Sequence, residues 1–160
     1  MAVELSGDLP CVAAHVDVEG VVCSGNDAAA HGVCVAAVHL PTGNRVGLRT
    51  KYLKGVVDAC GGISGSDRRM FLLGDMNAAE DEVQSVCKKL DLRDARYAGY
   101  SWGLRWNRFD AENSYPGPGL RKDRVLFGAE VWAEAHLLAQ GRVFVDGCGF
   151  CLSDHFGLLS

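Results

Sequence analysis

The middle of the chain alternates short apolar runs with one amphipathic stretch. Residues 33–38 form a nearly all-apolar run, which is typical of a strand that is covered on both faces. Apolar positions then recur every four residues from Leu48 to Cys60, which predicts a helix that ends at Gly61-Gly62. A second apolar run over 70–73 stops abruptly at Gly74. The pattern therefore predicts a strand–helix–strand unit.

Polar side chains follow both predicted strands directly. His39 comes after the first strand, and Asp75 and Asn77 come after the second. If a helical crossover joins two parallel strands, their carboxyl ends lie at the same edge of the sheet, where ligand crevices form. We therefore expect these three side chains to share one edge.

The rest of the chain predicts one more helix, a long loop and several strands. Residues 83–90 have helical apolar spacing, with Lys88-Lys89 in the last turn, and residues 98–120 are rich in Gly, Pro and aromatic residues. Further strands are expected at 11–18, 20–23, 125–127, 142–145 and 156–159. A length of 160 residues suits a single domain over 1–160. The fold class is α/β (α+β), about one sheet with flanking helices.

Composition and charge narrow the class of protein. A hydrophobic content of 48% with 22% charged residues excludes wholesale disorder. The chain has no apolar run of membrane-spanning length, and its first eight residues lack signal-peptide features, so an intracellular, soluble protein is expected, with nucleus or cytoplasm left open. The net charge of −4 argues against nonspecific polyanion binding. Residues 96–124, however, carry six basic and three acidic residues, and this stretch is a candidate phosphate-facing wall.

The seven cysteines do not form an obvious disulfide framework. Their number is odd, and five lie in or beside apolar runs, where a free thiol behaves as a small hydrophobic group. Cys148 and Cys151 have CxxC spacing, but no second ligand pair lies nearby. Reduced, partly buried thiols are the favoured interpretation, and zinc or redox use is the alternative.

The segment Gly74-Asp75-Met76-Asn77 places a carboxylate and an amide two residues apart after a buried strand. One side chain can hold a cation-bound water while the other orients it. The alternative is that Asn77 caps the next helix, with Glu80 completing a capping box. The helix-cap interpretation, however, gives no role to Asp75.

Three other polar positions each have a structural and a functional interpretation. Asp154 and His155 lie at a strand boundary, where a turn is the simpler explanation. His39 suits a hydrogen-bonded structural histidine or a catalytic one. Asp123 is either a surface charge or the group that orients an imidazole, because a histidine that acts as acid or base needs its second nitrogen fixed.

Taken in chain order, these fragments resemble the C-terminal half of the endonuclease/exonuclease/phosphatase superfamily, and within it they are most similar to the 5′-tyrosyl-DNA phosphodiesterases. The resemblance covers residues 33–160. The matching fragments are Val38-His39-Leu40, Phe71–Asn77, Ser101-Trp102 with Asn107, Lys122–Phe127 and Leu152–Leu158.

The resemblance implies a four-layer α/β/β/α sandwich, of which this chain supplies the C-terminal half, and Mg²⁺-dependent (or Mn²⁺-dependent) hydrolysis of phosphodiesters, with nucleic acid as substrate and DNA repair as context. It implies that Asp75 and Asn77 hold the attacking water, that Asp154 binds the metal and that Asp123 orients a histidine. His155 would contact the phosphate or move a proton, and His39 would add a further phosphate contact. The implied substrate-binding residues are Trp102, Asn107 and Arg124.

One part of the family pattern has no counterpart. The family's principal metal ligand is a glutamate in a Gln-Glu pair, and no such pair precedes His39. We therefore expect an incomplete domain, impaired or inactive on its own, with an open apolar sheet face available to a second copy or to a partner that supplies the N-terminal half. The alternative is a non-catalytic nucleic-acid- or protein-binding module derived from the same fold.

Overall fold

The computed structural model describes residues 2–4, 11–17, 32–64, 69–102, 119–137, 143–145, 148–150 and 158–159, and side chains over 33–61, 69–102 and 119–136. The elements in chain order are β1 (Ala2–Glu4), β2 (Cys11–Asp17), β3 (Gly32–His39), α1 (Val46–Ser64), β4 (Met70–Asp75), α2 (Glu80–Leu90), β5 (Leu92–Asp94), β6 (Asp123–Gly128), β7 (His136–Leu137), β8 (Val143–Val145), β9 (Cys148–Phe150) and β10 (Leu158–Leu159).

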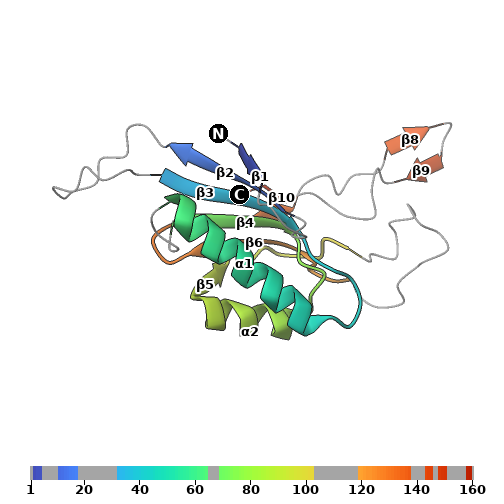
Figure 1. Ribbon diagram of the computed structural model, residues 1–160. Helices are drawn as coiled ribbons and strands as arrows, with labels where there is room; N and C mark the ends of the chain where they lie inside the picture. Colours follow the sequence, from blue (N-terminus) through green and yellow to red (C-terminus); the bar gives the residue numbers. More distant parts are fainter. Residues whose placement is uncertain are drawn as a thin grey trace.

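Within the described residues, six strands form one mixed sheet in the order β1-β2-β3-β4-β6-β5 (Figure 1). β3 and β4 are parallel and α1 joins them, which confirms the predicted strand–helix–strand unit. The other described neighbours in this sheet pair antiparallel. Two small sheets, β7 with β10 and β8 with β9, complete the described strands.

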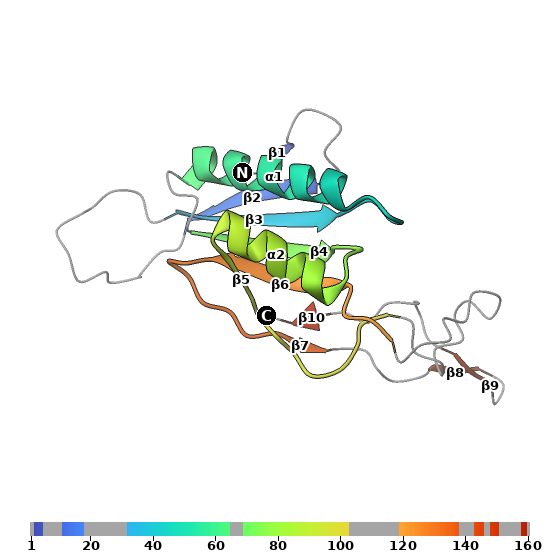
Figure 2. The ribbon, with the colours of Figure 1, turned by 90° about the horizontal axis from the view of Figure 1, so that it is seen from below.

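Both helices cover the same face of the sheet. In Figure 1 they lie below it, and Figure 2, seen from that side, shows them in front of the central strands. Because side chains alternate between the two faces of a strand, one set of residues meets the helices and the next set points away. The buried core on the helical face includes Cys34, Ala36, Met70, Leu72 and Leu126 from the sheet, Leu53, Val56, Val57 and Cys60 from α1, and Val83 and Val86 from α2.

The opposite face carries a second, smaller core. Val125 and Phe127 of β6 pack there with Ala95, Tyr97 and Ala135. Phe71 and Leu73 of β4 are only partly buried against this cluster. The two faces are therefore unequal, because two helices cover the first and an irregular segment covers part of the second.

One sequence prediction about a helix end is wrong, and one alternative is excluded. α1 continues through Gly61-Gly62 to Ser64, because glycine costs a helix only about 1 kcal/mol per residue, and tertiary packing overrides such a penalty. Asn77 does not cap α2, since the N-cap is Ala79 and the helix begins at Glu80.

Other predictions agree with the described strands more closely. The predicted strands over 125–127, 142–145 and 156–159 correspond to β6, β8 and β10, the last two shorter than expected. The strand predicted over 20–23 lies outside the described residues. β5, on which the sheet ends, was not predicted.

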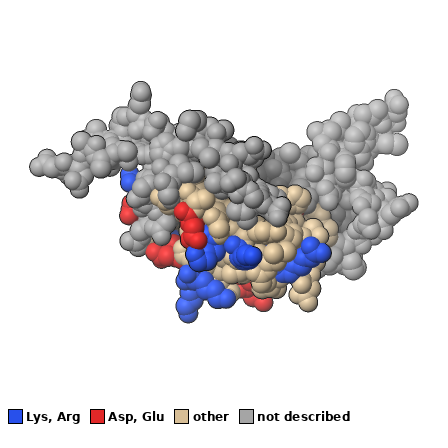
Figure 3. Space-filling view, in the orientation of Figure 1, with Lys and Arg blue, Asp and Glu red and all other residues tan. Residues whose placement is uncertain are grey.

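The exposed side of the helices is charged with both signs. Figure 3 shows Lys and Arg side chains next to acidic ones on this side of the described molecule. The exposed charged residues of the two helices include Lys51, Lys54, Asp58, Asp81, Lys88 and Lys89. Neither helix of the described chain combines the length and the hydropathy that crossing a membrane requires.

Candidate functional site

Three polar residues stand in a row across three neighbouring strands. His39 at the end of β3 pairs in register with Asp75 at the end of β4, and Asp75 pairs with Asp123 at the start of β6. Strand alternation places all three on the face that the helices do not cover. The predicted shared edge for His39 and Asp75 is therefore confirmed, and Asp123 lies at the same edge.

The backbone before Asp75 depends on glycine. Gly74 has φ of +136°, and a Cβ built on it would lie 2.0 Å from the carbonyl oxygen of Val38. Only glycine lets β4 approach β3 this closely. Backbone hydrogen bonds then fix the strand end on both sides, because Leu40 N–H donates to the Asp75 carbonyl at 2.9 Å and Met76 N–H donates to the Lys122 carbonyl at 2.9 Å.

The two carboxylate oxygens of Asp75 face different groups. Oδ1 accepts a hydrogen bond from the Asn77 backbone N–H at 2.8 Å, whereas Oδ2 lies 3.7 Å from Nε2 of His39. The Asp75 side chain is 15% exposed and that of His39 is 72% exposed. A recessed carboxylate is thus accompanied by an accessible imidazole.

Asn77 is held in a conformation that explains why it does not cap the helix. Its φ is +46°, in the left-handed region that asparagine tolerates better than most residues. Its side-chain Nδ2 donates to the Leu40 carbonyl at 2.9 Å, so Asn77 links the end of β3 to the end of β4. The Asp75–Asn77 pair is therefore part of the strand-end edge, and its functional interpretation stays a prediction.

Asp123 is positioned by two residues that the sequence analysis did not assign. Oγ of Ser101 accepts backbone hydrogen bonds from Lys122 N–H at 3.1 Å and Asp123 N–H at 3.0 Å, and the Tyr97 hydroxyl donates to the Asp123 carbonyl at 2.9 Å. Ser101 is fully buried. Burial raises the pKa of Tyr97 above its usual value, which keeps its hydroxyl protonated as a donor. The only sequence signal for these roles was the Ser101-Trp102 fragment of the resemblance.

An aromatic ring and a cation adjoin this support. Nζ of Lys122 lies 3.4 Å from the centroid of the Trp102 ring, a cation–π contact. Trp102 also forms a backbone bridge with Leu120, so the ring is attached to the segment that leads into β6. The expectation that Trp102 binds substrate stays a prediction. Lys122 is a further candidate, because it contacts this ring.

Arg124 lies on the other side of the sheet. It is one residue along β6 from Asp123, so its side chain points to the helical face, where it is 1% exposed. Its guanidinium contacts Asp94 at 2.8 Å and Glu80 at 2.9 Å. The structure therefore gives Arg124 a role in joining β6 to β5 and α2, and this placement does not support the predicted substrate contact. Strand alternation was the available signal, because neighbours in a strand point to opposite faces.

The remaining predicted site residues, Asn107, Asp154 and His155, lie outside the described residues. Among the described side chains, no three His, Cys, Asp or Glu residues gather as a metal site. Mg²⁺ prefers oxygen ligands, keeps several waters and uses one or two protein carboxylates. Oxygen ligands of this type are present in the carboxylates of Asp75 and Asp123 and in the amide of Asn77. These side chains are therefore suited to form part of the ligand set of such an ion.

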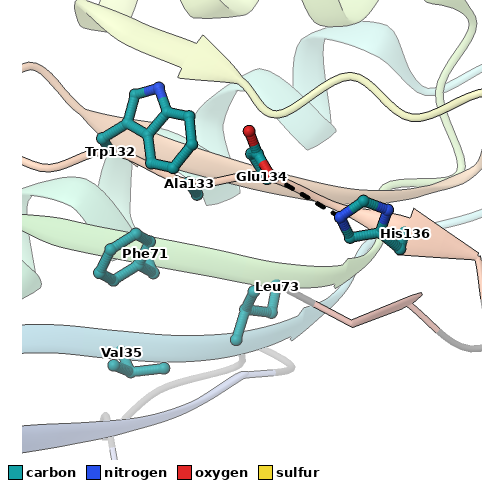
Figure 4. Close-up of a pocket in the computed structure, with 7 residues that line it drawn as sticks. All are labelled: Val35, Phe71, Leu73, Trp132, Ala133, Glu134 and His136. Atoms are coloured by element: carbon teal, nitrogen blue, oxygen red, sulfur yellow. Dashed lines mark ion pairs between the residues drawn. The ribbon is translucent and has the colours of Figure 1, made fainter.

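An apolar groove runs along the same face, beside the row of polar residues. It encloses about 540 Å³ and is lined by Val35, Phe71, Leu73, Trp132, Ala133, Glu134 and His136 (Figure 4). Trp132 is 69% exposed. At one end of the groove, Nε2 of His136 lies 3.8 Å from Oε2 of Glu134. Among the described residues, this groove is the exposed apolar part of the sheet face, and the expectation that a second copy or a partner covers it stays a prediction.

The sequence matches no protein-family model, and no curated protein matches it. Solved structures do match. Beta toxin from Staphylococcus aureus superposes with a TM-score of 0.70 at 17% identity over 94% of this chain and 56% of that chain. An endonuclease/exonuclease/phosphatase family protein from Bacteroides thetaiotaomicron gives 0.65 at 16% identity over 92% and 52%.

TDP2 from D. rerio, solved with a single-strand DNA product, gives a TM-score of 0.60 at 22% identity over 92% of this chain and 59% of that chain. At these identities the similarity establishes the fold, and it confirms the predicted resemblance at that level. The chain spans between 52% and 59% of the length of these three structures.

Proposed function

We propose that His39, Asp75, Asn77 and Asp123 are part of a metal-dependent centre that hydrolyses phosphodiesters in nucleic acid, of the 5′-tyrosyl-DNA phosphodiesterase type. The observation that carries the proposal is the row of His39, Asp75 and Asp123 at the ends of three neighbouring strands. The fold shared with TDP2 and with an endonuclease/exonuclease/phosphatase family protein supports the same reaction class.

In the proposed reaction, water attacks phosphorus while the bond to the leaving oxygen breaks, and the leaving oxygen takes up a proton. Asp75 and Asn77 orient the water, and the Asp75 carboxylate receives its proton. His39, exposed beside the recessed Asp75, contacts a phosphoryl oxygen. Asp123 orients a histidine, and the Ser101 and Tyr97 hydrogen bonds maintain its position.

The proposed centre needs a divalent cation, Mg²⁺ or Mn²⁺. Asp154 and the oxygen donors of the Asp75–Asn77 pair would hold it together with the substrate phosphate. When bound, the ion neutralises charge on the phosphoryl oxygens in the transition state. The Lys122–Trp102 pair would stack on a base or on an aromatic leaving group and add a positive charge near the phosphate.

We expect this chain to turn over slowly on its own. The glutamate that the resemblance requires as principal ligand has no counterpart before His39, and the chain spans little more than half of the similar structures. Tyrosine is the most informative leaving group for a slow catalyst, because a phenolate with a pKa of about 10 departs more readily than a sugar alkoxide.

The direct test is turnover of an oligonucleotide with a 5′-phosphotyrosyl end, measured with Mg²⁺, with Mn²⁺ and with chelator. The expected result is metal-dependent release of tyrosine, which Asp75→Asn lowers by about 10²–10⁴-fold. Asp58→Asn is the matched control, because Asp58 is an exposed carboxylate on α1 that pairs with Lys54. Turnover that is indifferent to metal or unchanged in Asp75→Asn would refute the proposal.

Binding of the same oligonucleotide gives a readout that does not need turnover. Fluorescence anisotropy should show metal-dependent binding that Lys122→Ala weakens, while Lys54→Ala leaves it unchanged. Equal effects of the two lysine variants would show that the interaction is a general charge effect rather than recognition at the strand ends.

The groove favours a second candidate function, a binding module. Val35, Phe71, Leu73 and the exposed Trp132 present an apolar surface of the kind that mediates protein association. Its occupant would be a second copy of the chain or a partner that carries the N-terminal half. Analytical ultracentrifugation tests the second-copy form of this module, which predicts self-association that Trp132→Glu abolishes. A stable monomer would exclude assembly with a second copy.

A further inference from the structure

Two cysteines from different elements meet in the helical-face core. Cys34 of β3 and Cys60 of α1 are both fully buried, and their sulfur atoms lie 2.6 Å apart. A disulfide has an S–S distance of about 2.05 Å, so bond formation would require a small adjustment. The pair joins positions 26 residues apart in the sequence.

A third cysteine of the same core provides a contrast. Cys87 of α2 is also buried, and burial raises its pKa to about 11, so it stays a protonated thiol near neutral pH. The thiol of Cys34 behaves differently, because its hydrogen bond to Cys60 lowers its pKa although burial acts in the opposite direction. The thiolate, which is the reactive form in disulfide exchange, therefore forms more readily at Cys34 than at Cys87.

We propose that Cys34 and Cys60 form a reversible disulfide that joins α1 to β3. The oxidant is a small-molecule disulfide of the glutathione type. One protein thiolate attacks it and releases one small thiol, and the second protein thiolate then attacks the mixed disulfide and releases the other. In sum, two protein thiols and one small disulfide give one protein disulfide and two small thiols.

The position of the bond suggests what it would do. Near the start of α1, Arg49 already fixes the helix through Glu82 at 2.6 Å and through the carbonyls of Pro41 and Gly43. Cys60 lies near the other end of α1. A disulfide there would fix the second end covalently to β3, the strand that leads to His39. This inference does not depend on the proposed function.

Burial determines when the bond can form. Both sulfurs are inaccessible once α1 has docked on the sheet, so exchange requires the helix to open transiently or to dock late in folding. The test therefore refolds the full chain from denaturant in a buffer of reduced and oxidised glutathione. Free thiols are then alkylated, and the protein is digested with trypsin and Asp-N.

This digestion isolates each cysteine of the core on its own peptide, 27–45 for Cys34, 58–66 for Cys60 and 81–88 for Cys87. Mass spectrometry should find the first two peptides joined, with the mass of the two free peptides less two hydrogen atoms. The third should be alkylated. Recovery of the first two as separate alkylated peptides, or joined to other cysteines, would overturn the proposal.

Thermal unfolding supplies a second readout. The oxidised protein should unfold about 5–15 °C above the reduced protein, because a cross-link restricts the unfolded chain. Cys60→Ala should abolish this dependence on redox state, and Cys87→Ala should preserve it. A redox-dependent shift that persists in Cys60→Ala contradicts the assignment, and if that variant does not fold, the wild-type peptide map decides alone.

Discussion

The two faces of the central sheet are built from alternate residues of the same strands and have become very different surfaces. Leu72 of β4 faces the helices and is fully buried, whereas its neighbour Leu73 is half-buried beside a groove. On β6, Arg124 is enclosed by two carboxylates on the helical face, whereas Asp123 lies at the open edge.

The residues of the helical face contribute to stability, whereas the residues at the end of the other face are the ones proposed to carry the chemistry. The helical face has a continuous apolar core closed by ion pairs, and no member of the row of polar strand ends lies on it. The other face combines a thinner core, an apolar groove and the row His39, Asp75 and Asp123. Substitutions on the first face should therefore affect folding, and substitutions at the end of the second should affect binding and turnover.

The largest effect on stability is expected at the point where β3 and β4 come closest. Gly74→Ala places a Cβ 2.0 Å from the Val38 carbonyl oxygen at a φ of +136°, so we expect a loss of at least about 3 kcal/mol in the free energy of unfolding. Urea denaturation measures this loss. Gly47→Ala on α1 is the control, since its Cβ meets nothing within 4 Å and should be neutral or stabilising.

Neighbouring leucines of β4 test the inequality of the faces directly. Leu72→Ala should lower the free energy of unfolding by about 3 kcal/mol, because it leaves a cavity in the helical-face core. Leu73→Ala should lower it by about 1 kcal/mol, because that side chain is already partly in contact with solvent. Equal losses in chemical denaturation would mean that the second face is as well covered as the first.

The smallest effect concerns the support of Asp123 and has a pH signature. Tyr97→Phe removes the hydrogen bond to the Asp123 carbonyl and should cost about 1 kcal/mol at neutral pH. Because burial raises the Tyr97 pKa in the folded protein, the unfolded chain ionises first as pH rises. The difference in free energy of unfolding between the wild type and Tyr97→Phe should therefore be constant below about pH 10, which is the ordinary pKa of tyrosine, and should decline above it.

Denaturation curves for both proteins from pH 7 to pH 11 would show this convergence. An advantage that stayed constant across the whole range would mean that the Tyr97 hydroxyl has the same pKa in the folded and unfolded chains.

Local sequence pattern predicted the part of the fold that depends on apolar periodicity. The runs over 33–38 and 70–73 became parallel strands, and the helical spacing between them became α1. The shared edge of His39 and Asp75 followed from that topology. The end of α1 could not be predicted, because packing along the helix outweighs the low helix propensity of Gly61-Gly62.

The supports of the site depend on tertiary contacts that no local pattern encodes. Ser101 and Tyr97 act on Asp123 from a segment more than twenty residues away. Asn77 has the chemistry of a helix cap, but its left-handed backbone and its hydrogen bond to the Leu40 carbonyl hold it at the sheet edge. The sequence analysis assigned Arg124 to substrate binding, although strand alternation places its side chain on the opposite face of the sheet from that of Asp123.

The most direct test of the central claim is paramagnetic broadening of backbone amide signals by Mn²⁺ in an NMR titration of the full chain. We predict that the signals of His39, Asp75 and Asp123 broaden first, and that Asp75→Asn suppresses this effect. Broadening that instead begins around exposed carboxylates such as Asp58, and is unchanged in Asp75→Asn, would contradict a metal-dependent centre at the ends of these strands.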